Sequence, residues 1–69
     1  MNYMDYIGRK FKKNGIKNIT FIVSDVYTIT NSSGKIIKQY FIAYNELADA
    51  EIYDFEVPLS TVLRGLINE

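Results

Sequence analysis

Two runs of β-branched and aromatic residues dominate the pattern of hydrophobic and polar positions along this chain. They cover residues 19–30 and 35–45, and the polar segment Asn31-Ser-Ser-Gly34 separates them. β-Branched side chains fit a pleated sheet, and Gly34 can adopt the positive φ angle that a tight turn requires. The pattern therefore predicts a β-hairpin, around which the rest of the chain is organised.

The faces of these two strands follow from the alternation of strand side chains. One face of the first strand is apolar apart from Asp25, and it holds Ile19, Phe21, Val23, Tyr27 and Ile29. Both faces of the second strand are apolar, with Ile36, Tyr40, Ile42 and Tyr44 on one and Ile37, Phe41 and Ala43 on the other. A lone charge in an apolar face is typical of a bulge or bend, so we expect one at Asp25.

Turn and cap residues predict the elements that flank the hairpin. A strand at about 6–13 leads through Asn14-Gly15, a preferred pair for a type I′ turn, into a long strand at about 16–30. A fourth strand at about 51–57 alternates between two faces, with Tyr53, Phe55 and Val57 on one and Asp54 and Glu56 on the other. Pro58 ends that strand, Ser60 caps a helical turn over Thr61–Arg64, and Gly65 ends the turn.

Together these elements predict a mostly β fold in a single domain, residues 1–69. The expected architecture is a small antiparallel SH3-like barrel of four to five strands with a C-terminal helical turn. The alternative is an α+β arrangement in which an N-terminal helix over residues 2–12 crosses an open antiparallel sheet. The apolar C-terminal residues either close one end of the barrel or cover the second apolar face of the third strand, and they are Leu59, Val62, Leu63, Leu66 and Ile67.

Composition restricts the chemistry that these 69 residues can perform. The chain contains no Cys and no His, so it lacks disulfides, the usual zinc ligands, the commonest general base and the best thiol nucleophile. Its four glycines are spread out and form no phosphate-binding loop. No apolar run reaches the roughly 18 residues that a membrane-spanning helix needs. We expect a non-enzymatic, cofactor-free, cytoplasmic protein that does not enter a membrane.

Charges of opposite sign are segregated, although the eight basic and eight acidic residues balance. The basic segment holds Arg9, Lys10, Lys12, Lys13 and Lys17. The acidic segment holds Glu46, Asp49, Glu51, Asp54 and Glu56. Either the two segments attract each other weakly as solvated edges, or one of them steers a charged partner. The five basic residues are candidate nucleic-acid contacts, and Glu51, Asp54 and Glu56 are candidate contacts for a partner protein.

Tyrosine, which occurs six times in the chain, is the other residue type suited to binding a partner. Tyr40 and Tyr44 lie on the second apolar face of the third strand and are candidate partner contacts, because Tyr offers a large rigid area at small entropic cost. Tyr27 and Tyr53 share faces with aliphatic residues, so we expect them in the core. A chain this small cannot cover both faces of its third strand, which predicts a homo-oligomer, most simply a dimer.

Strand and turn residues follow a recognisable order along the chain. They are Ile7-Gly8, Asp25-Val-Tyr-Thr28, Asn31-Ser-x-Gly34, Ile37-Lys38 with Tyr40, Val57-Pro-x-Ser-Thr61 and Arg64-Gly65. This order, over about residues 7–66, resembles small uncharacterised proteins encoded by bacteriophages. The resemblance implies a viral protein in the host cytoplasm that inhibits or sequesters a component of host defence. The alternatives are a small nucleic-acid-binding β-barrel and a small-ligand sponge with its site at a subunit interface.

Overall fold

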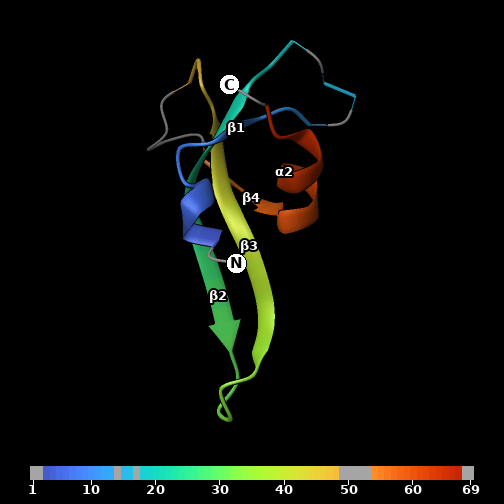
Figure 1. The fold of residues 1–69 in the computed structure, drawn as a ribbon. Helices are drawn as coiled ribbons and strands as arrows, with labels where there is room; N and C mark the ends of the chain where they lie inside the picture. The colour runs from blue at the N-terminus through green and yellow to red at the C-terminus, as the bar shows by residue number, and fades with distance from the viewer. Residues whose placement is uncertain (1–2, 14, 17, 49–53, 68–69) are drawn as a thin grey trace.

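The chain folds into a curled antiparallel sheet with a short helix against one face (Figure 1). The structure is a computed structural model, and it describes residues 3–13, 15–16, 18–48 and 54–67. In chain order the elements are the 3-10 helix η1 (Tyr3–Tyr6), β1 (Lys10–Phe11), β2 (Phe21–Thr30), β3 (Ile36–Asn45), β4 (Phe55–Pro58) and the helix α2 (Leu59–Gly65). The strands pair in sequence order, and every pairing is antiparallel. The prediction of a small, mostly β, antiparallel fold with a C-terminal helical turn is confirmed.

The central hairpin forms as its turn chemistry predicts. The Asn31 side chain accepts hydrogen bonds from the backbone N–H of Ser33 and from that of Lys35, each with an N–O distance of 3.0 Å. Gly34 adopts a φ of 85°, which its missing Cβ permits. The turn is therefore held by the Asn31 side chain together with two backbone hydrogen bonds, from the N–H of Gly34 to the carbonyl of Asn31 (3.0 Å) and from the N–H of Asn31 to the carbonyl of Lys35 (2.9 Å).

The expected bulge in the first hairpin strand is present, and the extra residue is Ser24. Val23 pairs with Ala43 and Asp25 pairs with Ile42, so Ser24 has no partner residue in β3. Because one extra residue reverses the alternation, Tyr27 lies on the face opposite to Val23. The prediction that Tyr27 belongs to the core is wrong: its exposed fraction is 47%.

The first strand is shorter than the predicted span 6–13, and β2 begins at Phe21 rather than near residue 16. Phe11 pairs directly with Phe21, so no tight hairpin turn joins β1 to β2. A turn does form at Gly15, whose φ is 83°, but Asn14 lies outside the described residues. After Phe11 the chain pairs with the distant C-terminal segment instead, because the N–H of Lys12 donates to the carbonyl of Gly65 over 2.9 Å.

The described residues do not form the N-terminal helix of the alternative α+β arrangement. Helical structure near the N-terminus is limited to η1, and the chain enters β1 at Lys10. Gly8 lies between the two with a φ of 88°, and its N–H donates to the carbonyl of Val23 over 2.8 Å. That conformation and that hydrogen bond attach the segment to β2 and prevent a continuous helix.

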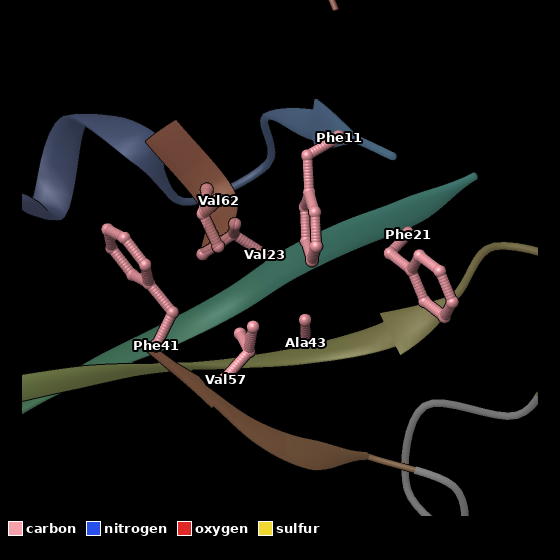
Figure 2. Close-up of a cluster of buried hydrophobic side chains, with 7 residues drawn as sticks. All are labelled: Phe11, Phe21, Val23, Phe41, Ala43, Val57 and Val62. Atoms are coloured by element: carbon pink, nitrogen blue, oxygen red, sulfur yellow. The ribbon is translucent and has the colours of Figure 1, made fainter. Parts of the chain in front are cut away.

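The core lies on one face of the sheet, under α2 (Figure 2). Within the described ranges, its buried side chains are Phe11, Phe21, Val23, Phe41, Ala43, Val57 and Val62. Tyr3 and Tyr6 of η1 also pack there, with their rings edge-on to Phe41 at centroid distances of 6.1 and 5.9 Å. We call this side of the sheet the inner face. Since Leu59 and Leu66 join Val62 against it, the C-terminal residues cover the Phe41 face of β3 and not the Tyr40 face.

Helix α2 begins and ends for reasons that differ from the predicted ones. Its N-cap is Pro58, with no capping side chain, so the prediction of a Ser60 cap is wrong and Ser60 lies within the first turn. Gly65 is the last helical residue, as expected, but a Cβ there would collide with the carbonyl oxygen of Lys12. Glycine is required at this position because two backbones meet, not because of a positive φ.

The fourth strand keeps its predicted alternation within the residues that the structure describes. Val57 is buried, Phe55 is half-buried and Glu56 is exposed, while Tyr53 and Glu51 lie outside the described residues. The strand is confined to Phe55–Pro58, with Val57 paired to Phe41 of β3. The short strand therefore adds its apolar side to the inner face and its acidic side to the opposite face.

Beyond the core, the hairpin of β2 and β3 extends as an arm, and Figure 1 shows it projecting away from α2. Every residue from 27 to 38 in this arm is exposed. The molecule measures 42 × 26 × 21 Å with a radius of gyration of 12.7 Å. A compact chain of this length has a radius of gyration of about 11 Å, so the arm makes the molecule elongated.

Candidate functional site

The face of the sheet opposite to the core is a candidate binding surface. We call it the outer face, and its apolar members are Ile22, Tyr27, Ile29, Tyr40, Ile42 and Tyr44. Cross-strand pairing puts Ile22 beside Tyr44 and Tyr27 beside Tyr40. In the described part of the chain both helices pack on the inner face, so neither covers this surface. Tyr40 and Tyr44, the predicted partner contacts, lie together on it, and the bulge at Ser24 adds Tyr27.

Tyr27 and Tyr40 form a stacked pair at the centre of this surface. Their ring centroids are 5.7 Å apart and their planes differ by 26°. The Lys38 ammonium lies 4.8 Å from the centroid of the Tyr40 ring and also forms an ion pair of 2.8 Å with Glu56 of β4. These contacts restrict the side chains before any partner arrives, which lowers the entropic cost of binding.

Charged groups around the stacked pair alter two protonation equilibria. The charge of Asp25 and a hydrogen bond to it raise the pKa of the Tyr27 phenol above its ordinary value. A hydrogen bond with Glu56, together with the charge of that carboxylate, raises the pKa of the Lys38 ammonium. At neutral pH the phenol therefore keeps its proton and Lys38 keeps its charge. The outer face thus has an aromatic centre with a charged rim, an arrangement typical of protein interfaces.

The predicted nucleic-acid contacts do not form one continuous surface. Lys10 forms an ion pair of 3.5 Å with Glu46, and the Arg9 guanidinium lies 5.8 Å from the centroid of the Tyr6 ring. Lys12 and Lys13 line a different region, and Lys17 lies outside the described residues. The Lys10–Glu46 pair joins the basic and acidic segments within one chain.

The acidic candidates are also divided. Glu56 is engaged by Lys38 on the outer face, and Asp54 is exposed just before β4. Glu51 and Asp49 lie outside the described residues. The described acids therefore contribute a partly neutralised rim to the outer face, rather than a separate acidic edge.

A hollow lies between the loop after β1 and the helix α2, away from the outer face. We call it the basic cleft; its volume is about 440 Å³, and it is lined by Lys12, Lys13, Gly15, Ile16, Thr61, Arg64 and Gly65. The sequence treated Thr61 and Arg64 only as helical-turn residues. Their spacing of three, which places both on one side of a helix, is the signal that could have found a shared surface, and the sequence analysis did not use it. Their proximity to Lys12 depends on long-range pairing that the sequence pattern does not contain.

The described residues do not gather metal-ligating side chains. No group of three or more Asp or Glu side chains lies close enough to hold an ion within the parts of the chain that the structure describes. Among the described helices, none has the length and apolarity needed to span a membrane. In the described residues, every buried side-chain nitrogen or oxygen has a hydrogen-bond partner.

Compared with known proteins, the sequence matches no family model, no curated protein and no solved structure. Evidence on function therefore comes from the geometry of the outer face and of the basic cleft.

Proposed function

We propose that this chain is a non-enzymatic binding protein that holds a partner protein against its outer face. The observation that carries the proposal is the stacked Tyr27–Tyr40 pair at the centre of a face that neither described helix covers. Tyrosine is enriched among the residues that contribute most to binding energy at protein interfaces. The absence of His and Cys supports a function that acts through surface contacts and not through catalysis.

The energetic argument concerns the apolar side chains that remain in water. Tyr27 and Ile29 are 47% and 42% exposed, while Ile22, Ile42 and Tyr44 are half-buried. Complete burial of a large apolar side chain contributes about 1.5–3 kcal/mol, so covering the remaining exposed parts of this face contributes several kcal/mol. A partner that covers the outer face and the arm gains this energy without refolding the sheet.

The resemblance to small bacteriophage proteins supports a host component, in a defence system, as the partner. Binding across the outer face would block whatever surface that component uses for its own ligand. The charged rim formed by Asp25, Lys38 and Glu56 then contributes orientation and selectivity more than affinity. Asp54, beside this rim, adds to its negative charge.

A second copy of the chain is the competing occupant of the same face. Two copies related by a two-fold axis would bury Tyr40 and Tyr44 against each other or against the facing β-strand. Such a homodimer would bury the same apolar surface, and the outer face would then be inaccessible to another protein. Mass measurements at several concentrations separate the two occupants.

Nucleic acid is favoured less by this geometry. Arg9 and Lys10 are engaged by Tyr6 and Glu46, away from the cleft that Lys12 and Lys13 line. A groove for a single strand needs basic and aromatic side chains along one continuous path. The divided arrangement supports a partner protein as the main ligand.

The test uses two pairs of substitutions on opposite faces of the same arm. The double variant Tyr27→Ser with Tyr40→Ser removes the outer stack. The control, Thr28→Ala with Gln39→Ala, removes the neighbouring cross-strand pair, whose side chains share a hydrogen bond of 3.1 Å. Wild type and both variants, each checked for folding by circular dichroism, are used to capture proteins from a bacterial host lysate, and the captured protein is then purified and titrated.

We expect the outer-stack variant to bind the purified partner about 30-fold or more weakly, the loss of one strong interface contact, while the control binds like wild type. Equal affinity of the outer-stack variant and wild type would contradict the proposal. Equal weakening by both variants would also contradict it, because the effect would then belong to the arm as a whole.

A further inference from the structure

We propose that the edge of β2 within the arm pairs with the same edge of a second copy of this chain, at a surface distinct from the outer face and independent of the function proposed for it. On one side β2 pairs with β3, but on its other side the described pairing ends at Val23. There the N–H of Val23 donates to the carbonyl of Arg9, and its carbonyl accepts from the N–H of Gly8. Within the described ranges, no strand pairs with residues 25–30 on that side. Figure 1 shows this part of β2 extending past η1 toward the hairpin turn.

The edge presents backbone groups to solvent at every second residue. The N–H of Val26 donates to the Asp25 carboxylate over 2.8 Å and therefore points away from β3. The N–H of Asn31, five residues later, donates back across the hairpin turn. Because successive N–H groups of an antiparallel strand point to opposite sides, those of Thr28 and Thr30 point away from β3 as that of Val26 does. They are the donors available to a new strand.

This stretch lacks the residues that usually protect a sheet edge from pairing. Residues 26–30 read Val-Tyr-Thr-Ile-Thr, with no charge, no Pro and no Gly. Natural edges are commonly protected by Lys or Pro. The β3 side of the same arm carries Lys35 and Lys38, and Lys38 is paired with Glu56 of β4. The β2 edge is therefore the side of the arm that is suited to strand pairing.

A second copy fits this edge because the stretch is complementary to itself about Thr28. With a two-fold axis at Thr28, each Thr28 N–H donates to the Thr28 carbonyl of the other copy. Each Thr30 N–H donates in the same way to the Val26 carbonyl of the other copy. These bonds leave the Val26 N–H on the Asp25 carboxylate, so the existing contact is kept. The edge can pair without rearrangement of either chain.

The side chains that meet in this register are compatible. Tyr27 lies opposite Ile29 of the second copy, in a pair without backbone hydrogen bonds, where cross-strand side chains approach most closely. Both side chains are exposed in the single chain. Thr28 meets its own copy, and Asp25 lies opposite Asn31, so no like charges face each other. Aromatic–β-branched pairs and Thr–Thr pairs both stabilise neighbouring strands.

The two-fold axis stands perpendicular to the sheet, so the assembly ends at two chains. Each copy uses its one open β2 edge, and an isologous contact of this kind leaves no second edge of the same type. The two outer faces then lie on the same side of one continuous sheet. Because the paired stretch is short, we expect a weak dimer with a dissociation constant of about 0.1 mM.

The experiment measures sedimentation equilibrium of the full chain from about 10 µM to about 1 mM. Thr28→Lys places two ammonium groups opposite each other at the axis, and Thr28→Glu supplies the opposite charge for a mixing test. Gln39→Lys is the matched control, because it adds the same charge and removes the same 3.1 Å hydrogen bond between Gln39 and Thr28. In the dimer it lies about 14 Å from its own copy, three strand spacings away and beyond the screening length. Circular dichroism of each variant establishes that the fold is retained.

We expect Thr28→Lys to weaken dimerisation about fivefold or more, the upper cost of like charges directly opposite, while Gln39→Lys stays within about twofold of wild type. An equimolar mixture of Thr28→Lys and Thr28→Glu should associate more tightly than Thr28→Lys alone. In wild type, isotope-filtered NMR should detect contacts between Tyr27 of one chain and Ile29 of the other.

A wild-type chain that stays monomeric at about 1 mM would overturn the proposal. Equal weakening by Thr28→Lys and Gln39→Lys would do the same, as would a mixture of the two Thr28 variants that associates no better than Thr28→Lys alone. Contacts between chains that centre on Tyr44 would place the second copy on the outer face and not at the β2 edge.

Discussion

Tyr27 lies on the outer face because one nearby residue, Ser24, is an extra residue in β2. Without that extra residue, strict alternation would turn Tyr27 toward the core beside Val23. Instead it stacks on Tyr40 at a centroid distance of 5.7 Å, on the same face as Asp25. One residue in β2 thus converts an expected core side chain into the centre of the proposed binding surface.

The first prediction concerns the acidity of Tyr27. Because the charge of Asp25 and a hydrogen bond to it raise the pKa of the phenol, Asp25→Asn should lower that pKa toward its ordinary value. A proton held more tightly in the folded chain stabilises it below about pH 10, and this contribution is lost as the pH rises through the raised pKa. Ring resonances of Tyr27 followed against pH in wild type and in Asp25→Asn provide the measurement. An unchanged Tyr27 titration in Asp25→Asn would show that Asp25 is not the cause.

The second prediction concerns Gly65. A Cβ at this position meets the Lys12 carbonyl oxygen, so Gly65→Ala should force the loop and the helix apart and destabilise the fold by about 1–3 kcal/mol. Ser60→Ala is the control on the same helix, because Ser60 provides no cap, and it should change stability by less than about 0.5 kcal/mol. Urea unfolding measures both. A loss for Ser60→Ala as large as that for Gly65→Ala would contradict this account of how α2 begins and ends.

At the scale of elements, the β2–β3 hairpin has two parts with different surroundings. Near Val23 and Ala43 it is buried under α2, whereas from residue 27 to residue 38 it is exposed. An isolated two-stranded hairpin is marginally stable in water. The arm therefore depends on its turn, on its cross-strand pairs and on the core from which it extends.

The third prediction follows from this division. In the free protein, backbone amides in the ladder of the arm should exchange with solvent through local opening, at rates well above those of Val23 and Ala43, which need global unfolding. Hydrogen exchange followed by NMR measures these rates residue by residue. Binding of a partner across the arm should slow exchange there and leave Val23 unaffected. Equal protection of arm and core in a dilute sample would contradict the description of the arm.

Local chemistry is what the sequence predicts well in this chain. Asn31 and Gly34 specify their turn with adjacent residues, and the charge of Asp25 marks the position of the bulge. Counting faces through that bulge nevertheless placed Tyr27 in the core, because the alternation reverses at the extra residue. The short β1 and the basic cleft depend on the pairing of Lys12 with Gly65, a long-range contact that neither local pattern encodes. The sequence pointed to Tyr40 and Tyr44, but not to Arg64.

At the scale of the whole molecule, the outer face and the basic cleft lie on different parts of the fold. The outer face is formed by strands and carries aromatic side chains, and the basic cleft is formed by a loop and a helix and carries charge. The chain is neutral overall, so these local distributions determine what it attracts, rather than its net charge.

The central claim is that the sheet has one face packed against the helices and one face open to a partner. Relaxation of methyl groups by a soluble paramagnetic agent tests it directly, in a sample diluted until light scattering gives the 8.0 kDa mass of a single chain. We predict strong relaxation at Ile29 of the outer face and protection at Val23 and Val62, with Ile29 becoming protected when a partner or, at higher concentration, a second copy binds. Protection of Ile29 equal to that of Val62 in the free monomer would contradict the account.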